Sequence, residues 1–192
     1  MNRRTEAVSG DITAEATDVV VNAANAELAR GGGVCGAIFA AAGPGLAEAC
    51  AALGGCATGD AKATPGFGLP ARWVVHAVGP RWHGGDQGES ELLASAYRRS
   101  LEVADDLGAS SIAFPAISTG IYGYPLDAAT AIAVATGRET PGRHLELVRF
   151  VCFDAETLRS YQEALSLDWP SSSRSNRGQP RLLQRRIREA AL

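Results

Sequence analysis

Short apolar runs alternate with stretches of helical periodicity along residues 7–165. The apolar runs predict strands, which fall at residues 7–9, 19–21, 73–78, 111–115 and 147–153. The helical spacing predicts helices, which fall at residues 34–42, 46–53, 91–107, 127–135 and 155–165. Nearly continuous apolar strands are typical of a parallel sheet that is buried on both faces. The alternation therefore predicts an α/β fold, a three-layer α/β/α sandwich around a mixed, largely parallel central sheet.

The composition is that of one globular domain. With 46% hydrophobic and 20% charged residues, the 192-residue chain has enough apolar side chains for one core. No apolar window approaches the roughly 18 residues of a membrane-spanning helix. No apolar core follows the basic pair Arg3-Arg4, so we expect neither a membrane segment nor a signal peptide. The four cysteines form no CxxC pair, which indicates a reduced, cytoplasmic location, and the preference for Arg over Lys indicates a bacterial genome rich in GC.

The charge is unevenly distributed along the chain. Residues 1–169 carry 12 Arg or Lys against 20 Asp or Glu, whereas residues 170–192 carry six Arg against one Glu. We therefore expect a domain at residues 1–168 and a flexible basic tail at residues 169–192. The acidic domain argues against a general affinity for nucleic acid, because phosphate binding relies on clustered positive charge. The tail is either a solvated extension packed on its own domain or a nucleic-acid tether.

Polar and glycine-rich loops follow several of the predicted strands, at the sheet edge where ligands bind in open α/β folds. The loops at residues 30–36 and 115–125 combine glycines with a helix start, which suits the binding of a pyrophosphate through backbone N–H groups. Asp11 is suited to accept a hydrogen bond from an adenine amino group, and Phe153 to cover the base. Asn25 offers an amide for ribose hydroxyls. Together these loops predict a nucleotide-diphosphate site.

Each of these features also has a purely structural interpretation. The glycines at residues 31–33 are alternatively a flexible turn, Phe153 a core residue at a strand end, and Asp11 the cap of a turn. Neither a GxGxxG fingerprint nor a P-loop is present. The cysteines and the three histidines show no metal-ligand spacing, so we expect no metal, and His76 is expected to make a hydrogen bond in the core.

Several motifs occur together and in order, at residues 10–13, 21–25, 31–38, 42–44, 55–61, 69–80 and 117–125. In this combination the chain resembles the macrodomain family, and within it the MacroD-like class, over roughly residues 6–167. The resemblance implies a site for ADP-ribose that needs no cofactor. It also implies that the partners are ADP-ribose and mono-ADP-ribosylated proteins, and we expect a monomer.

The resemblance further implies a role for each loop. Asp11 would bond the adenine N6, with the backbone of Ile12 nearby, and Phe153 would lie on the base. Asn25 would hold the distal ribose, and Tyr122 would flank it. Backbone N–H groups of two loops would clasp the phosphates, and these groups belong to Gly32, Gly33, Val34, Ser118, Thr119, Gly120, Ile121 and Tyr122.

MacroD-like proteins typically remove ADP-ribose from acidic side chains or deacetylate O-acetyl-ADP-ribose. The resemblance makes Asn25, Gly33, Cys35 and Tyr122 the catalytic candidates. The chain departs from the class at two positions, because Cys35 stands where an Asp is usual and Phe39 where a His is usual. That Asp is assigned to orient or deprotonate the attacking water, a contribution worth on the order of 10²–10⁴ in rate.

Four interpretations of Cys35 are open. A bound phosphate oxygen positions the water in its place, or Cys35 itself acts as a thiolate base or nucleophile. Alternatively, the chain is a non-catalytic ADP-ribose reader. In the fourth interpretation Cys35 is a small residue that fills the space left by the Asp. The sequence predicts a hydrolase of ADP-ribosyl esters as the leading function.

Overall fold

The computed structural model describes residues 3–167, which form one six-stranded sheet in the order β1-β6-β5-β2-β4-β3. The strands are β1 (Arg4–Ser9), β2 (Val19–Ala23), β3 (Ala61–Pro65), β4 (Trp73–Ala77), β5 (Ser111–Phe114) and β6 (Leu147–Cys152). The helices are η1 (Ile12–Ala14), α1 (Gly33–Ala42), α2 (Pro44–Ala52), α3 (Glu89–Asp106), α4 (Leu126–Glu139) and α5 (Ala155–Ser166). All pairings are parallel except that of β3 with β4, so the predicted mixed, largely parallel sheet is confirmed.

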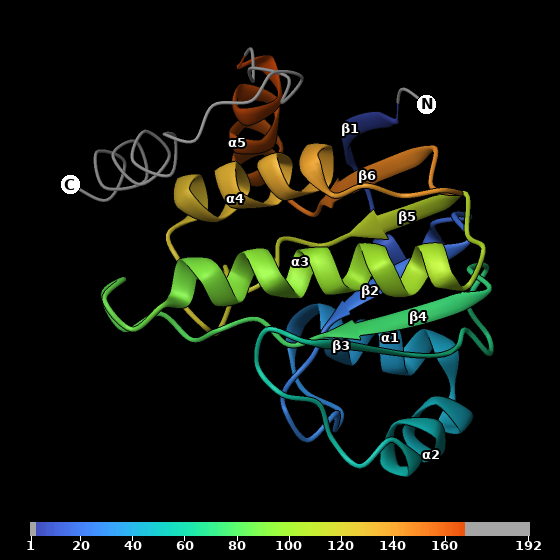
Figure 1. Cartoon of the computed structure of the whole chain (residues 1–192). Helices are drawn as coiled ribbons and strands as arrows, with labels where there is room; N and C mark the ends of the chain where they lie inside the picture. Colours follow the sequence, from blue (N-terminus) through green and yellow to red (C-terminus); the bar gives the residue numbers. More distant parts are fainter. Residues whose placement is uncertain (1–2, 168–192) are drawn as a thin grey trace.

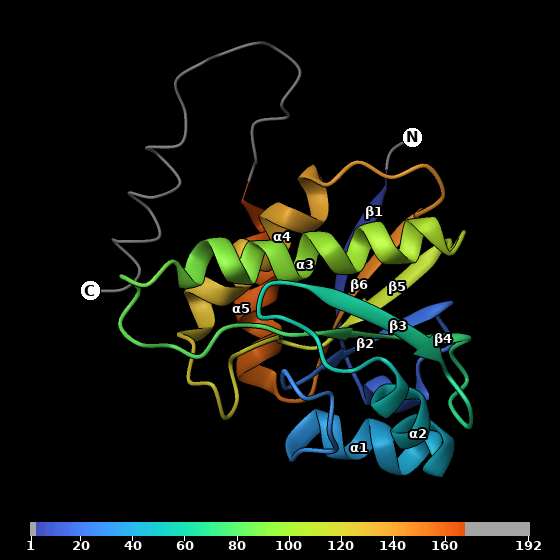
Figure 2. The same cartoon turned by 60° about the horizontal axis from the view of Figure 1, so that its bottom comes forward.

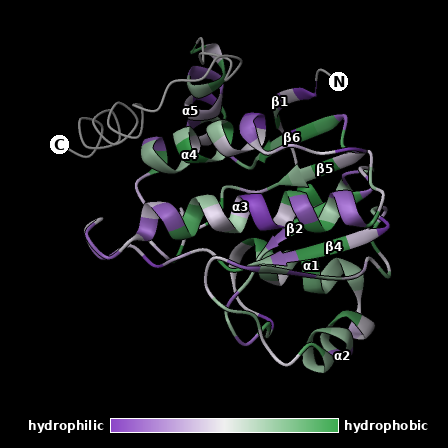
Figure 3. Cartoon of the chain, in the orientation of Figure 1, coloured by the Kyte–Doolittle hydropathy of each residue, from purple (hydrophilic) through white to green (hydrophobic). Residues whose placement is uncertain are grey.

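Helices cover both faces of the sheet (Figures 1 and 2). The side chains of β2 point alternately to the two faces of the sheet. Val19 and Val21 pack into the core shared with α3, α4 and α5, whereas Val20 packs into the core shared with α1 and α2. Figure 3 shows hydrophilic bands along α3, as expected for a helix that has one face toward solvent. It shows none along α1, which is built largely of small apolar residues. The predicted three-layer sandwich is therefore confirmed.

A cluster of buried aromatic rings fixes the start of the loop that follows β5. The rings of Phe150 and Tyr161 stack with their centres 4.6 Å apart, and Tyr97 lies 5.1 Å from Phe114. The Tyr97 hydroxyl bonds the Tyr161 hydroxyl at 3.2 Å and accepts the N–H of Ile117, also at 3.2 Å. Burial raises the pKa of Tyr97 to about 12, so the hydroxyl stays protonated in this role.

One strand was missed by the sequence pattern. The segment Ala61–Pro65 has no apolar run, yet it forms β3 at the sheet edge, antiparallel to β4. A lysine and a proline are typical of such an edge, and the Lys62 ammonium donates to the carbonyls of Leu53 and Gly55 at 3.0 and 2.6 Å. The first strand also begins earlier than expected, at Arg4.

The predicted helices all occur, with ends shifted by a few residues. Helix α2 begins earlier than predicted, at Pro44, because proline is favoured in the first turn of a helix. Helix α4 begins at Leu126 and ends at Glu139. Among residues 3–167 no single helix is long and apolar enough to cross a membrane. Only the pair α1 and α2, bent by 111°, meets the length and composition test together. The predicted basic tail, 169–192, lies outside the described residues.

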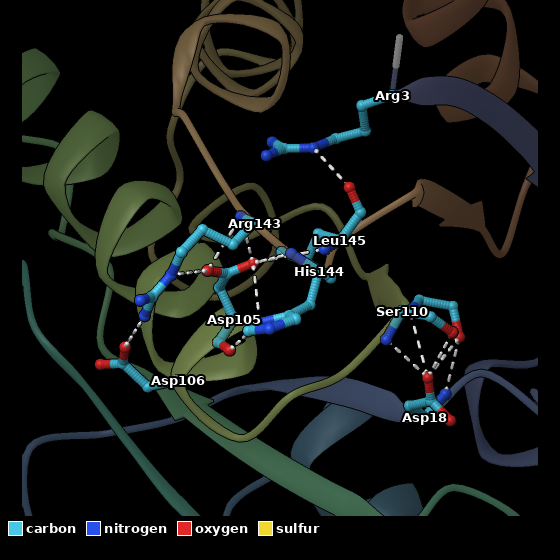
Figure 4. Close-up of polar contacts among 9 residues, drawn as sticks. Arg3, Asp18, Asp105, Asp106, Ser110, Arg143, His144 and Leu145 are labelled. Carbon is cyan, nitrogen blue, oxygen red and sulfur yellow. Dashed lines mark hydrogen bonds and ion pairs between the residues drawn. The ribbon is translucent and has the colours of Figure 1, made fainter. Parts of the chain in front are cut away.

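Buried or half-buried acidic side chains fasten the chain at the edge of the sheet where the parallel strands begin (Figure 4). The Asp105 carboxylate accepts the backbone N–H groups of Arg143, His144 and Leu145 at 2.8, 2.7 and 3.2 Å. Burial alone raises the pKa of a carboxyl, but these bonds outweigh it, so the pKa of Asp105 is lowered. Asp18 makes a similar junction with the N–H and hydroxyl groups of Ser110, at 2.8 and 2.7 Å.

We expect Asp105→Ala to lower the free energy of unfolding by about 2–3 kcal/mol, because several backbone donors lose a charged acceptor. Since the pKa of Asp105 is lowered by folding, its stabilising effect is present above the unfolded pKa of about 3.9 and is lost as the pH falls below it. Urea titration between pH 3 and 7 measures both effects. Asp106→Ala is the control, because its side chain is 78% exposed. Equal stability of the two variants at pH 7 would contradict the assignment.

Candidate functional site

The carboxyl ends of β1, β6, β5, β2 and β4 meet at one edge of the sheet because these strands are parallel. The arrowheads of β4 and β5 in Figure 1 point toward that edge. The loops that follow the strands therefore lie in sheet order, beginning with Asp11 after β1 and Phe153 after β6. The loop 115–125 comes next, then the loop 24–32, and finally the loop 78–88 after β4. This is the edge at which ligands bind in open α/β sheets.

The glycine loop after β2 presents an uncapped helix start. Gly32 is the N-cap of α1, and among the residues that the structure describes no side chain caps this helix start. Those groups have no acceptor within the helix and attract anions. Gly33, the first residue of the helix, has φ +55°, a conformation that favours glycine. The predicted helix start is therefore present at Gly32, Gly33 and Val34, and its binding of an anion stays a prediction.

Asn25 fixes the other end of this loop. Its amide nitrogen donates to the carbonyl of Ala29, and its amide oxygen accepts the N–H of Ala29, both at 2.9 Å. The side chain is half-buried and lies beside Gly31. Asn25 thus shapes the loop in this structure, and its contact with a ribose stays a prediction.

The loop after β5 holds its backbone in an unusual conformation. Ser118 has φ +68° although it is not glycine, which costs of order 1 kcal/mol or more. Its hydroxyl is buried and has no hydrogen-bond partner among the described residues. A Cβ on Gly79, in the loop after β4, would lie only 2.2 Å from that hydroxyl oxygen. The close approach of the two loops at this point therefore requires glycine at position 79.

The same loop has backbone donors that its own turns do not use. Its internal bonds run from Thr119 to Ala116, from Gly123 to Gly120 and from Tyr124 to Ser118. Within residues 3–167 these bonds leave the N–H groups of Gly120, Ile121 and Tyr122 without a backbone acceptor. The Ile121 side chain is 78% exposed, and its terminal carbon lies beside Gly32. The two loops predicted to hold a pyrophosphate therefore meet.

Cys35 is buried beneath the glycine loop, on the first turn of α1. Its sulfur accepts the N–H of Gly31 at 3.4 Å and the amide N–H of Asn22 at 3.7 Å. Its thiol donates to the carbonyl of Ala29 at 3.8 Å. These contacts tie the sulfur to the loop backbone and to the core, which favours the interpretation of Cys35 as a packing residue.

A buried polar cluster, which we call the Asn22–His76 cluster, lies under Cys35. The His76 ring nitrogens lie 3.1 Å from the Asn22 amide nitrogen and 2.9 Å from the Thr64 hydroxyl, while the Cys50 sulfur lies 3.5 Å away. The predicted core hydrogen bond of His76 is thus confirmed. Burial lowers the pKa of His76 to about 4, so the ring is neutral at pH 7. The sequence pattern missed Asn22, whose amide oxygen is buried without a partner among the described residues.

Asp11 and Phe153 stand at the other end of the row of loops. The Asp11 carboxylate accepts the hydroxyl and the N–H of Thr13 at 2.7 and 2.9 Å, so it caps η1 while its side chain stays exposed. The Thr13 hydroxyl and N–H lower the pKa of Asp11, which keeps it ionised. Phe153 lies just beyond β6 and is 90% exposed, so the alternative that placed it in the core is wrong. Ile12, the predicted neighbour of the base, is the first residue of η1 and its side chain is buried.

The sequence analysis missed Arg81, in the loop after β4. Its guanidinium carbon lies 4.4 Å from the centre of the Tyr122 ring, and the N–H of Trp82 donates to the carbonyl of Tyr122 at 2.9 Å. The Glu89 carboxylate holds this loop through three backbone N–H groups, those of His83, Gly85 and Gln87. Both residues are visible in the sequence, but they are far apart in it, and only the fold brings the two loops together.

The part of the chain that the structure describes contains no group of three or more His, Cys, Asp or Glu side chains that could hold a metal ion. The loops carry a row of backbone donors. At one end of this row are the exposed ring of Phe153 and the carboxylate of Asp11, and at the other end is the guanidinium of Arg81. Such a set can bind an elongated anion with a base at one end.

Comparison with known proteins places the chain in a family. The family model "Macro domain" matches residues 21–133. A Macro domain-containing protein of Chlorobaculum tepidum is 56% identical over 162 residues, which are 83% of this chain and 94% of that protein. An O-acetyl-ADP-ribose deacetylase of Enterobacter cloacae is 51% identical over 176 residues, covering 86% and 96%. The chain therefore belongs to the Macro domain family.

Solved structures agree with this assignment. A variant of the Oceanobacillus iheyensis macrodomain with ADPR superimposes with a TM-score of 0.80 at 42% identity, covering 85% of this chain and 92% of that one. The Trypanosoma brucei macrodomain in complex with ADP-ribose gives a TM-score of 0.78 at 40% identity, covering 83% and 68%. The predicted family and fold are thus confirmed.

Proposed function

We propose that the chain binds ADP-ribose and hydrolyses ADP-ribosyl esters. The substrates we assign are mono-ADP-ribose on acidic side chains of proteins and O-acetyl-ADP-ribose. The observation that carries the proposal is the meeting of the two donor loops at Gly32 and Ile121, beside an uncapped helix start. Relatives that are named O-acetyl-ADP-ribose deacetylase, among them one from Citrobacter rodentium at 51% identity, support the same reaction class.

The order of the strands supports one orientation of the ligand. Adenine lies over Phe153 and bonds Asp11, since β1 and β6 are neighbours at one side of the sheet. The diphosphate then lies between the loops after β5 and β2, where backbone donors are free. The distal ribose reaches Asn25 and Tyr122. Backbone amides suit this task because their directions are fixed before the ligand arrives.

The contacts of Cys35 bear on how water is activated. Its sulfur is buried and engaged with Gly31, Asn22 and Ala29, so a role as base or nucleophile would require it to leave these partners. We assign positioning of the water to an oxygen of the bound diphosphate instead. The water oxygen bonds to the carbonyl carbon of the ester, and the bond between that carbon and the ribose oxygen breaks. One proton of the water goes to the leaving ribose oxygen, and the carboxylic acid that forms releases its proton to solvent. The loops contribute by orienting the distal ribose.

A second candidate function is a non-catalytic ADP-ribose reader. One observation favours it: the thiol of Cys35 stands at the position where MacroD-like proteins carry an acid, so the usual carboxylate for orienting water is absent. Both candidates predict tight binding of ADP-ribose, and only the first predicts turnover.

Release of ADP-ribose separates the two candidates. The full chain is incubated with a glutamate-linked mono-ADP-ribosylated protein and, separately, with O-acetyl-ADP-ribose, and the products are quantified by chromatography. We expect release of free ADP-ribose and of acetate above a buffer control. Binding without release in either assay would establish the reader, and the absence of any binding by calorimetry would overturn both candidates.

We expect Asp11→Ala to weaken ADP-ribose binding by roughly 1.5–3 kcal/mol, because a charged hydrogen bond to the base is lost. Isothermal titration calorimetry measures the change. Asp11→Asn is the matched variant, since it keeps an acceptor for the N–H of Thr13 but removes the charge. Its affinity for ADP-ribose should lie between those of the wild type and Asp11→Ala. An unchanged dissociation constant for Asp11→Ala would mean that the base lies elsewhere.

For Cys35 we expect Cys35→Ala to keep hydrolysis within about threefold of the wild-type kcat, because the thiol does no chemistry in the proposed reaction. Cys35→Asp should raise kcat if orientation of the water limits the rate, by up to the roughly 10²-fold at the lower end of general-base effects. Single-turnover kinetics measure both. Loss of turnover in Cys35→Ala with unchanged ADP-ribose affinity would restore the thiol as a catalytic group.

A further inference from the structure

Arg81 is a cation that the fold positions but does not neutralise. Its side chain is exposed, and within residues 3–167 no carboxylate lies within ion-pair distance of it. Other arginines are paired, for example Arg149 with Glu6 and Glu15, both at 2.8 Å. The partner that Arg81 does have is the face of the Tyr122 ring, 4.4 Å from the guanidinium carbon. In an acidic chain, an unpaired guanidinium held in one place is a binding group for an anion.

The loop that carries Arg81 is held on two sides. The Glu89 carboxylate anchors it at His83, Gly85 and Gln87 through their N–H groups. The Trp82 N–H donates to the Tyr122 carbonyl, and the Trp82 ring packs on Tyr124 with the ring centres 4.7 Å apart. The guanidinium is thus placed before a ligand arrives, which reduces the entropy lost on binding.

Strand order places Arg81 at the end of the row of loops that lies away from the base. The loop after β4 adjoins the glycine loop on the side opposite to β5, whereas Asp11 and Phe153 follow β1 and β6. A ligand with its adenine at Phe153 and its diphosphate between Gly32 and Ile121 directs its distal ribose toward Tyr122. Whatever group is attached to that ribose therefore approaches Arg81.

We propose that Arg81 binds the acyl group of the substrate, that is, the carboxyl oxygens of the ester on the distal ribose. The proposal rests on the proposed hydrolysis and names what recognises the acyl part of the same substrate. The planar fork of a guanidinium matches two carboxyl oxygens. Negative charge grows on the carbonyl oxygen when water attacks the carbonyl carbon, and the product is a carboxylate, so the contact strengthens toward the transition state. Arg81 is thus a specificity-determining residue for acylated ADP-ribose.

A contact with the diphosphate is the other chemistry open to a guanidinium here, and the two contacts have different consequences. An acyl contact affects only ligands that carry the acyl group. A phosphate contact affects free and acylated ADP-ribose alike. Comparing the two ligands therefore identifies the occupant.

The test uses Arg81→Gln and Arg81→Lys in the full chain. Arg72→Gln is the matched control, because Arg72 makes the same kind of contact with an aromatic ring, 5.5 Å from the centre of Trp73, at the beginning of β4 and so away from the site. Calorimetry gives the dissociation constant of free ADP-ribose, and initial rates give kcat/KM for O-acetyl-ADP-ribose and for the glutamate-linked substrate.

For Arg81→Gln we expect free ADP-ribose affinity within about twofold of wild type and kcat/KM lower by roughly 10- to 100-fold for both esters. Arg81→Lys should recover part of the loss, because the charge remains while the planar fork is absent. Arg72→Gln should match wild type. An equal loss of free ADP-ribose binding in Arg81→Gln would assign the residue to the diphosphate or to support of Tyr122, and an unchanged kcat/KM would remove it from recognition altogether.

If the wild-type chain cleaves neither ester, the proposed function fails but the role of Arg81 is still tested. A non-hydrolysable analogue of O-acetyl-ADP-ribose, with an amide in place of the ester, then replaces the substrates. Wild type should bind this analogue more tightly than free ADP-ribose, and Arg81→Gln should lose the preference. Equal affinities of wild type for the two ligands would overturn the inference on Arg81.

Discussion

The parallel alignment of five strands determines where every part of the candidate site lies. Because these strands end at one edge of the sheet, loops that are far apart in the sequence become neighbours in the order of the sheet. The only lysine, Lys62, is engaged with two carbonyls just beyond α2. On our proposal, the diphosphate is bound by backbone N–H groups. Such groups act as a set only when the strands bring their loops together.

The strain at the site is offset by the core beneath it. Ser118 holds a left-handed conformation with a buried, unpartnered hydroxyl, an arrangement that is unfavourable on its own. Immediately before it, the N–H of Ile117 is bound by the buried Tyr97 hydroxyl, which the stacked rings around Phe150 hold in place. The aromatic core therefore does more than bury area, because it fixes the direction in which the loop leaves β5. A rigid core under a strained loop is how a fold keeps donors pointing at a ligand in its absence.

The sequence predicts most of the fold because the parallel strands are buried on both faces and read as apolar runs. The strand β3 was not predicted, because an edge strand pairs on one side only and its sequence of Ala, Lys and Thr has no apolar run. For the site, motif residues such as Asp11 and Gly32 were predictable, since Asp11 lies just after a strand and Gly32 lies in a glycine-rich run at the start of a helix. Arg81 was not, because its significance comes from the Tyr122 ring, which is about forty residues away in the sequence and adjacent only across loops.

Cys35 and Arg81, both at the distal end of the site, form one electrostatic argument. An Asp at position 35 would place a carboxylate beside a bound diphosphate. Because Cys35 has no carboxylate, that repulsion is absent, together with the group that is assigned to activate water in MacroD-like proteins. Arg81 adds a positive charge where, on our proposal, the acyl oxygens become negative. On the proposed reaction, catalysis relies less on activating the water and more on stabilising the acyl group that the water attacks. Both effects lower the same barrier, so the proposed role of Arg81 matters more in a site without the Asp.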